Sequence, residues 1–174
     1  SFQTVRTNGY DKTFAALMKN AFSALYLTAD AETAAVELRR LKRKAALLIA
    51  MADLSGAWSL NKITESLSVL AEACLRIAVS ALLREAAAKG DWTISNPENP
   101  EENSGLIVLA MGKLGARELN YSSDIDLIVL YDADIAPYAG KRDIGAFFVK
   151  LTRALVAMME EQTPQGYVFR TDLR

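Results

Sequence analysis

The sequence contains no histidine and a single cysteine, Cys74. Without imidazole, neither a Ser-His-Asp nor a Cys-His catalytic centre can be built, and most catalytic zinc sites are also excluded. Any catalysis must therefore use carboxylates, lysine or arginine, hydroxyls or hard metal ions. A lone cysteine also excludes an internal disulfide, which favours a reducing compartment, and we expect a cytoplasmic protein.

The chain lacks an excess of either charge and lacks a long apolar run. Its 20 basic and 21 acidic residues leave a formal charge of −1, which excludes a globally basic nucleic-acid binder. No uninterrupted apolar stretch approaches the roughly 20 residues of a membrane span. We therefore expect neither a nucleic-acid nor a membrane partner. The lack of a signal peptide and of an initiator methionine, with strand-like residues at the carboxyl end, predicts a fragment of a longer polypeptide.

Alanine, the strongest helix former, is concentrated in the first half of the chain. There, apolar residues recur at spacings of three and four in three successive sets, which predicts three amphipathic helices within residues 1–90. Asp30 can cap the second helix, Ser59 or Asn61 the third, and Gly90 is suited to the end of the third helix. Short connections between long helices predict a bundle of antiparallel neighbours.

Residues 91–104 contain two prolines and several turn formers without periodicity, which predicts a linker or long loop. The core that follows, residues 105–174, is predicted to be truncated at its carboxyl end. It contains three strand-like runs, at residues 106–111, 125–131 and 167–172. It also contains an amphipathic helical segment at 141–161 and a possible short helix at 113–120. The first run is continuously apolar, as in a strand buried on both faces. We predict an α+β protein, in which a helical bundle precedes a small mixed sheet.

Two aspartates stand at the start of the second predicted strand. Side chains at i and i+2 of a strand point to one face, so Asp124 and Asp126 are predicted to lie side by side. Adjacent carboxylates repel, and a divalent cation removes this cost. An all-oxygen ligand set favours Mg²⁺, with Mn²⁺ also suitable. The competing interpretation is a pair of solvated aspartates ahead of a strand.

Two further features accompany these aspartates. Gly112 and Lys113 follow the first predicted strand, where a glycine lets the backbone approach phosphate oxygens. Asp172 stands at the end of the third predicted strand and can supply a third carboxylate, with Arg170 on the same face by alternation. Taken alone, Gly112 is also explained by an ordinary strand-to-helix turn, and Asp172 by a strand-end cap.

The order of strand, glycine-containing turn, Asp-x-Asp strand, helix and strand ending in aspartate resembles the nucleotidyltransferase fold of the polymerase-β type. The chain departs from the usual Gly-Ser of that fold by having Gly112-Lys113. The resemblance implies catalytic residues that also ligate the metal, namely Asp124, Asp126 and Asp172. The nucleotide- or phosphate-binding residues that it implies are Gly112, Lys113, Ser123 and Arg170.

Residues 110–127 and 165–174 resemble the signature of the glutamine synthetase adenylyltransferase/adenylyl-removing enzyme family. The resemblance implies two nucleotidyltransferase units in one polypeptide. One unit adenylylates a tyrosine of glutamine synthetase from ATP, and the other removes the AMP with orthophosphate to give ADP. Segments 118–121 and 167–172 are more similar to the adenylyl-removing unit. The resemblance also implies control by the PII signal protein and glutamine.

Three other functions stay open at this point: the adenylylating unit, a catalytically incomplete regulatory fragment, and a tRNA-type or antibiotic nucleotidyltransferase. The last predicts Gly-Ser at 112–113 or a basic RNA-binding surface, and the sequence shows neither. Nucleotide binding that depends on a metal ion and on Asp124 and Asp126 would separate an enzyme from a scaffold.

Two features of the helical half complete the expectations. The basic run at residues 39–44 is predicted to be a solvated helix face, with contact to an acidic partner or a nucleotide as the alternative. Cys74 lies on the apolar stripe of the third helix and is predicted to be buried and inert.

Overall fold

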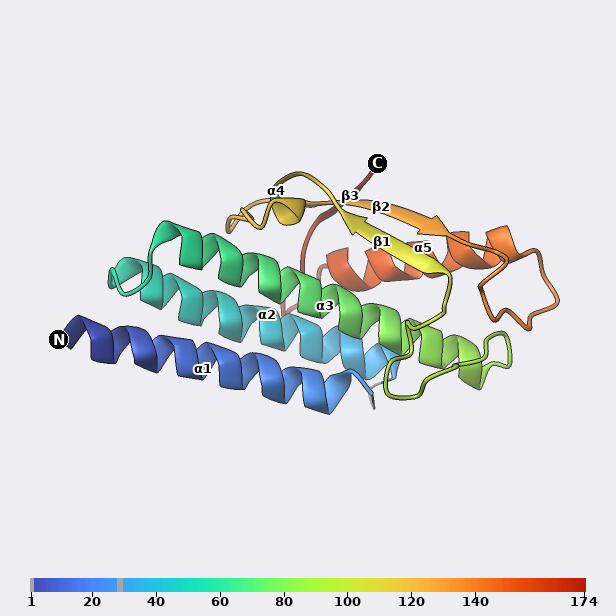
Figure 1. The fold of residues 1–174 in the computed structure, drawn as a ribbon, viewed down its shortest axis with the longest axis horizontal. Helices are drawn as coiled ribbons and strands as arrows, with labels where there is room; N and C mark the ends of the chain where they lie inside the picture. The colour runs from blue at the N-terminus through green and yellow to red at the C-terminus, as the bar shows by residue number, and fades with distance from the viewer. Residues whose placement is uncertain (1, 28–29) are drawn as a thin grey trace.

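The computed structural model describes residues 2–27 and 30–174, with side chains described from Gly9 onward (Figure 1). Three long helices, α1 (Phe2–Leu25), α2 (Ala31–Leu54) and α3 (Leu60–Ala88), run side by side and form the predicted amino-terminal bundle. Leu38 of α2 and Leu70 and Ile77 of α3 are fully buried. The spacing of apolar residues therefore identifies the inward faces of these helices correctly.

The helix ends follow the predicted capping residues. Oδ1 of Asp30 accepts a hydrogen bond from the Thr33 amide at 2.7 Å at the start of α2. Oγ of Ser59 accepts one from the Lys62 amide at 3.4 Å at the start of α3. Gly90 follows α3 with a φ of +77°, the left-handed conformation that glycine adopts without strain. The predicted caps at Asp30, Ser59 and Gly90 are confirmed.

The rest of the chain builds a three-stranded mixed sheet from β1 (Leu106–Ala110), β2 (Ile125–Tyr131) and β3 (Thr171–Leu173), in the order β1-β2-β3. β1 pairs with β2 antiparallel, and β2 pairs with β3 parallel. The one-turn helix α4 (Gly112–Gly115) follows β1, and α5 (Ile144–Glu160) connects β2 to β3. The described chain is therefore an α+β protein, as predicted.

Two elements are about half as long as the sequence predicts. Only one turn of residues 113–120 is helical, because Arg117 adopts a φ of +59° and cannot continue the helix. β3 begins at Thr171 instead of residue 167. The amides of Val168 and Phe169 donate to the carbonyl of Met159 in α5, at 2.9 and 3.0 Å, and so are not available to a neighbouring strand.

Helices cover only one face of the sheet (Figure 1). On the covered face, Ile125 and Leu127 are at most 1% exposed. On the open face, Ile107 and Leu109 are each 44% exposed. The prediction that the first strand is buried on both faces is wrong, because its continuous apolar run reflects an outer face that is apolar without being covered.

One hydrophobic core joins the bundle to the sheet and includes Ile77 of α3, Leu127 of β2 and Leu155 of α5. By length and composition alone α3 could cross a membrane, but 78% of its most apolar window is buried inside the protein. Such burial is also what a core helix shows. Cys74 lies within this buried face of α3, as predicted.

Candidate functional site

The predicted carboxylates gather on the open face of the sheet. Asp126 of β2 lies directly opposite Asp172 of β3 in the parallel register. Residues opposite each other in neighbouring strands point to the same face, so the Asp126 and Asp172 side chains share one face. The structure thus brings Asp126 and Asp172 to one side of the sheet, away from the long helices, with Asp124 just before β2.

A single cation stands between two of these carboxylates. One terminal nitrogen of Arg174 lies 2.7 Å from Oδ1 of Asp126 and 3.0 Å from Oδ2 of Asp172. Its Nε donates a further hydrogen bond to Asp126 at 3.1 Å. The hydrogen bonds to Asp126, with the charges of Asp172 and Asp126, raise the pKa of Arg174. The Asp126–Asp172 pair is therefore a place that attracts positive charge.

Asp124 has a different cationic partner. Nε of Arg170 lies 2.5 Å from Oδ1 of Asp124, and another guanidinium nitrogen of Arg170 donates to the carbonyl of Ser122 at 2.8 Å. About half of each side chain is exposed, 51% for Asp124 and 56% for Arg170. Both groups are therefore accessible to a ligand from solvent.

Hydrogen bonds fix the loop that leads into Asp124. Oδ1 of Asn120 accepts hydrogen bonds from the Ser122 amide at 3.1 Å and from Oγ of Ser123 at 2.8 Å, which forms an Asx turn. Leu119 is fully buried, and its amide donates to Oγ of Ser68 in α3 at 3.2 Å. The hydroxyl of Ser123, a predicted phosphate-binding residue, thus donates its hydrogen bond to Asn120 within the loop.

Gly112 leaves room for the carboxylate of Asp126. Its φ is +53°, and a Cβ built on Gly112 would lie 2.7 Å from Oδ2 of Asp126. The neighbouring Lys113 is exposed, and among the described residues its ammonium group has no hydrogen-bond or ion-pair partner. The strand-to-helix turn therefore carries an exposed positive charge at the residue after Gly112, the glycine that lies against Asp126.

The donor set at Asp126 and Asp172 fits a hard divalent cation. It consists of oxygens only and carries two negative charges, which suits Mg²⁺ or Mn²⁺. Arg174 already supplies positive charge between these oxygens. Across the described part of the chain, however, no three acidic or cysteine side chains form a group that could hold a metal ion. Asp124 is turned toward Arg170 and stands outside the pair.

Two contributors to this site were not identified from the sequence, although signals for both exist. Arg174 follows Asp172 by two positions, so strand alternation places it on the same face. Asn120 precedes Ser122 by two positions, the spacing at which an asparagine side chain accepts a hydrogen bond from the backbone.

A cavity of about 430 Å³ lies on the opposite side of the sheet. It is lined by Val108 and Leu127 of the covered face, by Leu75 of α3, and by polar residues that include Glu72 and Arg117. Because the sheet separates this cavity from Asp126 and Asp172, it is not part of the carboxylate site.

The helical bundle, the mixed sheet and the carboxylates on its open face are the arrangement that a nucleotidyltransferase is expected to show. Residues 5–174 match the family model described as glutamate-ammonia ligase adenylyltransferase. The chain belongs to this family.

Several curated relatives carry the name bifunctional glutamine synthetase adenylyltransferase/adenylyl-removing enzyme. The relative from Bradyrhizobium diazoefficiens is 45% identical over 164 residues, which cover 94% of this chain and 16% of the relative. One from Rhodopseudomonas palustris (strain HaA2) is 45% identical over 161 residues, covering 92% of this chain and 16% of the relative. One from Bradyrhizobium sp. (strain ORS 278) is 50% identical over 137 residues, covering 79% of this chain and 14% of the relative. The chain thus spans about one-sixth of the length of these relatives.

Proposed function

We propose that the open face of the sheet is a nucleotidyltransferase site that removes AMP from the adenylylated tyrosine of glutamine synthetase. The observation that carries this proposal is the pairing of Asp126 with Asp172 across the guanidinium of Arg174, on the face of the sheet opposite the long helices. The names of the relatives, which include an adenylyl-removing activity and glutamine synthetase, support the substrate.

The proposed reaction is a phosphorolysis. An oxygen of orthophosphate attacks the phosphorus of the AMP–tyrosine phosphodiester and forms a new P–O bond. The bond from that phosphorus to the tyrosyl oxygen breaks, and the oxygen takes the proton that orthophosphate gives up. The products are ADP and the free tyrosine side chain. No side-chain nucleophile is required, which suits a chain without histidine whose single cysteine is buried.

The residues of the site divide this work by charge. Mg²⁺ or Mn²⁺ held by Asp126 and Asp172 would neutralise negative charge on the phosphoryl oxygens. Asp124 would become a further ligand only after leaving Arg170. The Lys113 ammonium group has no partner among the described residues and can bind a phosphate group directly. Arg170 binds Asp124 through one edge of its guanidinium and suits the incoming orthophosphate, because its forked donors match phosphate oxygens.

The same carboxylates would also serve the adenylylating reaction, since both reactions are displacements at the α-phosphorus. We assign this chain to the removing unit on the similarity of segments 118–121 and 167–172. Control by the PII signal protein and a cytoplasmic location belong to the same proposal.

The test uses a full-length adenylyltransferase that carries this chain, with Asp126→Asn and Asp124→Asn as variants. ADP release from adenylylated glutamine synthetase, with orthophosphate and Mg²⁺, should fall by roughly 1,000-fold or more, because charge stabilisation at the phosphoryl group is lost. Asp134→Asn is the matched control, because Asp134 is an exposed aspartate close after β2 whose carboxylate makes no hydrogen bond or ion pair among the described residues.

Three results would decide the proposal. Loss of removal with retention of addition supports it. Loss of addition with retention of removal assigns the chain to the adenylylating unit. Retention of both activities in Asp126→Asn would show that the open face is not an active site.

A further inference from the structure

The segment between α5 and β3 determines where Asp172 lies. β3 has only three residues and pairs with β2 along one edge. Residues 161–170, which lead into it, contain neither a helix nor a strand, apart from a turn in which Thr163 and Gly166 exchange backbone hydrogen bonds at 3.2 and 2.8 Å. The position of Asp172 therefore depends on how this connecting segment is held.

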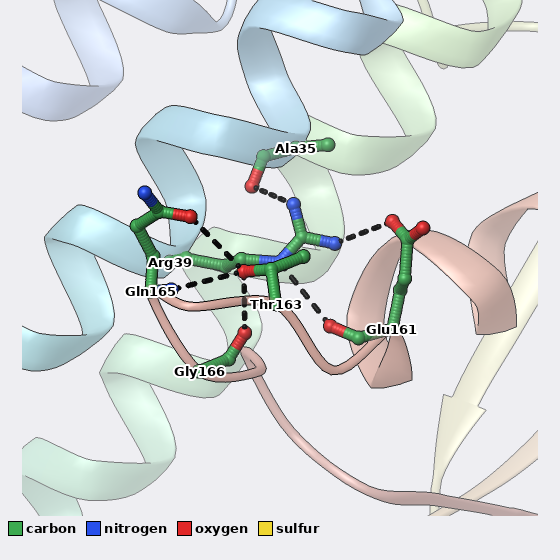
Figure 2. Close-up of polar contacts among 6 residues, drawn as sticks. All are labelled: Ala35, Arg39, Glu161, Thr163, Gln165 and Gly166. Atoms are coloured by element: carbon green, nitrogen blue, oxygen red, sulfur yellow. Dashed lines mark hydrogen bonds and ion pairs between the residues drawn. The ribbon is translucent and has the colours of Figure 1, made fainter.

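Arg39 of α2 holds the beginning of the segment. Its side chain is only 3% exposed, and one terminal nitrogen lies 2.8 Å from Oε2 of Glu161. Its Nε donates to the carbonyl of Glu161 at 3.3 Å, and its other terminal nitrogen donates to the carbonyl of Ala35 at 3.0 Å. Figure 2 shows the guanidinium reaching from α2 to Glu161, beside the turn at Thr163 and Gly166. Two of the three nitrogens thus fix α2 to the end of α5, and the third bonds within α2.

Lys42 of α2 holds the end of the segment. Its Nζ donates to the carbonyl of Val168 at 3.1 Å and lies 4.0 Å from the centre of the Phe169 ring. Val168 and Phe169 are at most 4% exposed. Burial lowers the pKa of Lys42, with a smaller opposing effect from Cys74. A partly buried ammonium group needs such partners, because it has lost part of its hydration.

These two residues depart from the predicted solvated face at 39–44. Arg40, Arg43 and Lys44 are exposed as predicted, but Arg39 is buried and Lys42 is partly buried. Arg39 and Lys42 are three positions apart and so share one face of α2. That face is directed at the segment leading to β3, and the prediction was wrong for these two residues.

We infer that Arg39 and Lys42 are positioning residues that set the catalytic geometry of Arg170 and Asp172 from the helical bundle. This inference rests on the proposed function. α5 gives β3 a second attachment, since Oε1 of Glu160 accepts hydrogen bonds from the amide and the hydroxyl of Thr171, each at 2.6 Å. Loss of Lys42 should therefore loosen β3 without unfolding the sheet.

The experiment compares Lys42→Met with Arg43→Met in the full-length protein. Arg43 lies on the same helix and is exposed, and its guanidinium makes no hydrogen bond or ion pair in the described part of the chain. Lys42→Met should lower kcat for ADP release by about 10–100-fold, because small displacements of reacting groups have effects of this size. KM for adenylylated glutamine synthetase should change by less than about threefold, since the protein substrate has other contacts to make. Arg43→Met should leave both constants unchanged.

Hydrogen exchange supplies the readout that does not depend on activity. In Lys42→Met, the amides of Val168, Phe169 and Thr171 should exchange about tenfold faster or more, while those of α3 keep their rates. If Lys42→Met does not fold, Glu161→Gln tests the other attachment, because Glu161 is exposed and its carboxylate contacts Arg39. In that variant the exchange of the same amides should also rise and kcat should fall.

Faster exchange with unchanged kcat would overturn the inference, because β3 would move without a catalytic effect. A lower kcat with unchanged exchange would also overturn it, because Lys42 would then act in another way. If the unmodified protein releases no ADP while exchange responds as expected, the proposed function fails, and with it the catalytic part of the inference, but the attachment of β3 stands.

Discussion

Gly112 lies so close to the carboxylate of Asp126 that a Cβ atom at position 112 would clash with it. A Cβ on Gly112 would lie 2.7 Å from Oδ2 of Asp126, below the 3.0 Å under which Cβ contacts are essentially never found. Gly112 also has a φ of +53°, in the left-handed region. Glycine is therefore required at position 112 for two reasons: the backbone is left-handed there, and the Asp126 carboxylate leaves no room for a side chain.

Gly112→Ala should lower both stability and activity. The left-handed backbone costs a non-glycine residue about 1–3 kcal/mol, and the methyl group should displace Asp126 and reduce activity roughly 100-fold. The measurements are thermal unfolding and ADP release. Gly90→Ala is the control, because Gly90 has a φ of +77° but nothing lies within 4 Å of its added Cβ. An equal loss of activity in the control would show that strain alone explains the effect.

Arg117 combines backbone strain with ion pairs. Its φ is +59°, and its guanidinium lies 2.5 Å from Glu65 and 3.1 Å from Glu72 of α3. Arg117→Ala loses the ion pairs and keeps the strain, whereas Arg117→Gly loses the pairs and relieves it. The glycine variant should therefore melt about 2–4 °C above the alanine variant, by the usual relation of stability to Tm at this chain length. An alanine variant that melts at or above the glycine variant would show that Arg117 is not strained.

Tyr26 should make the protein sensitive to alkaline pH. Burial, with the hydrogen bond and charge of Glu101, raises the pKa of Tyr26 to about 12 from 10.0. Because the folded state holds this proton more tightly, the stabilisation is complete below pH 10 and is lost as pH rises from 10 to about 12. Tyr26→Phe should cost about 1–3 kcal/mol at pH 7, the loss of a hydrogen bond to a charged group, and should flatten this alkaline fall.

Chemical unfolding at pH 7, 10 and 12 checks the prediction for Tyr26. Tyr121 is the matched comparison, since burial and the carboxylate of Asp53 raise its pKa to about 12 as well. Tyr121→Phe should also reduce the loss of stability over the same pH range. An alkaline fall that is unchanged in both variants would contradict the assignment.

Cys74 should not react with thiol reagents in the folded protein. It is fully buried, and burial raises the pKa of its thiol to about 12, so the reactive thiolate is scarce. Reaction with a thiol-specific reagent should be about 1,000-fold slower than for the unfolded chain and should track unfolding in denaturant. Rapid labelling at neutral pH without denaturant would contradict this.

Local signals in the sequence predict much of the fold. Asp30 and Ser59 cap helices through residues three positions away, and β2 has the predicted bounds of residues 125–131. These features need no knowledge of distant parts of the chain.

Features that depend on tertiary contacts could not be predicted from local patterns in the sequence. Arg39 is buried because it meets Glu161, which lies 122 positions away. Ile107 is exposed because the described helices lie on the other side of the sheet, and an apolar run cannot reveal which neighbours are present. Asp124 turns to Arg170 and Asp126 to Arg174, a choice between cations that depends on the register of β3.

The most direct test of the central claim follows radioactive orthophosphate. A full-length adenylyltransferase carrying this chain is incubated with adenylylated glutamine synthetase, Mg²⁺ and labelled orthophosphate, and the nucleotides are separated. Phosphorolysis at the Asp126–Asp172 site predicts that the label appears in the β-phosphate of ADP, and that Asp126→Asn abolishes this product. Release of AMP with the label left in orthophosphate, or labelled ADP formed undiminished by Asp126→Asn, would contradict it.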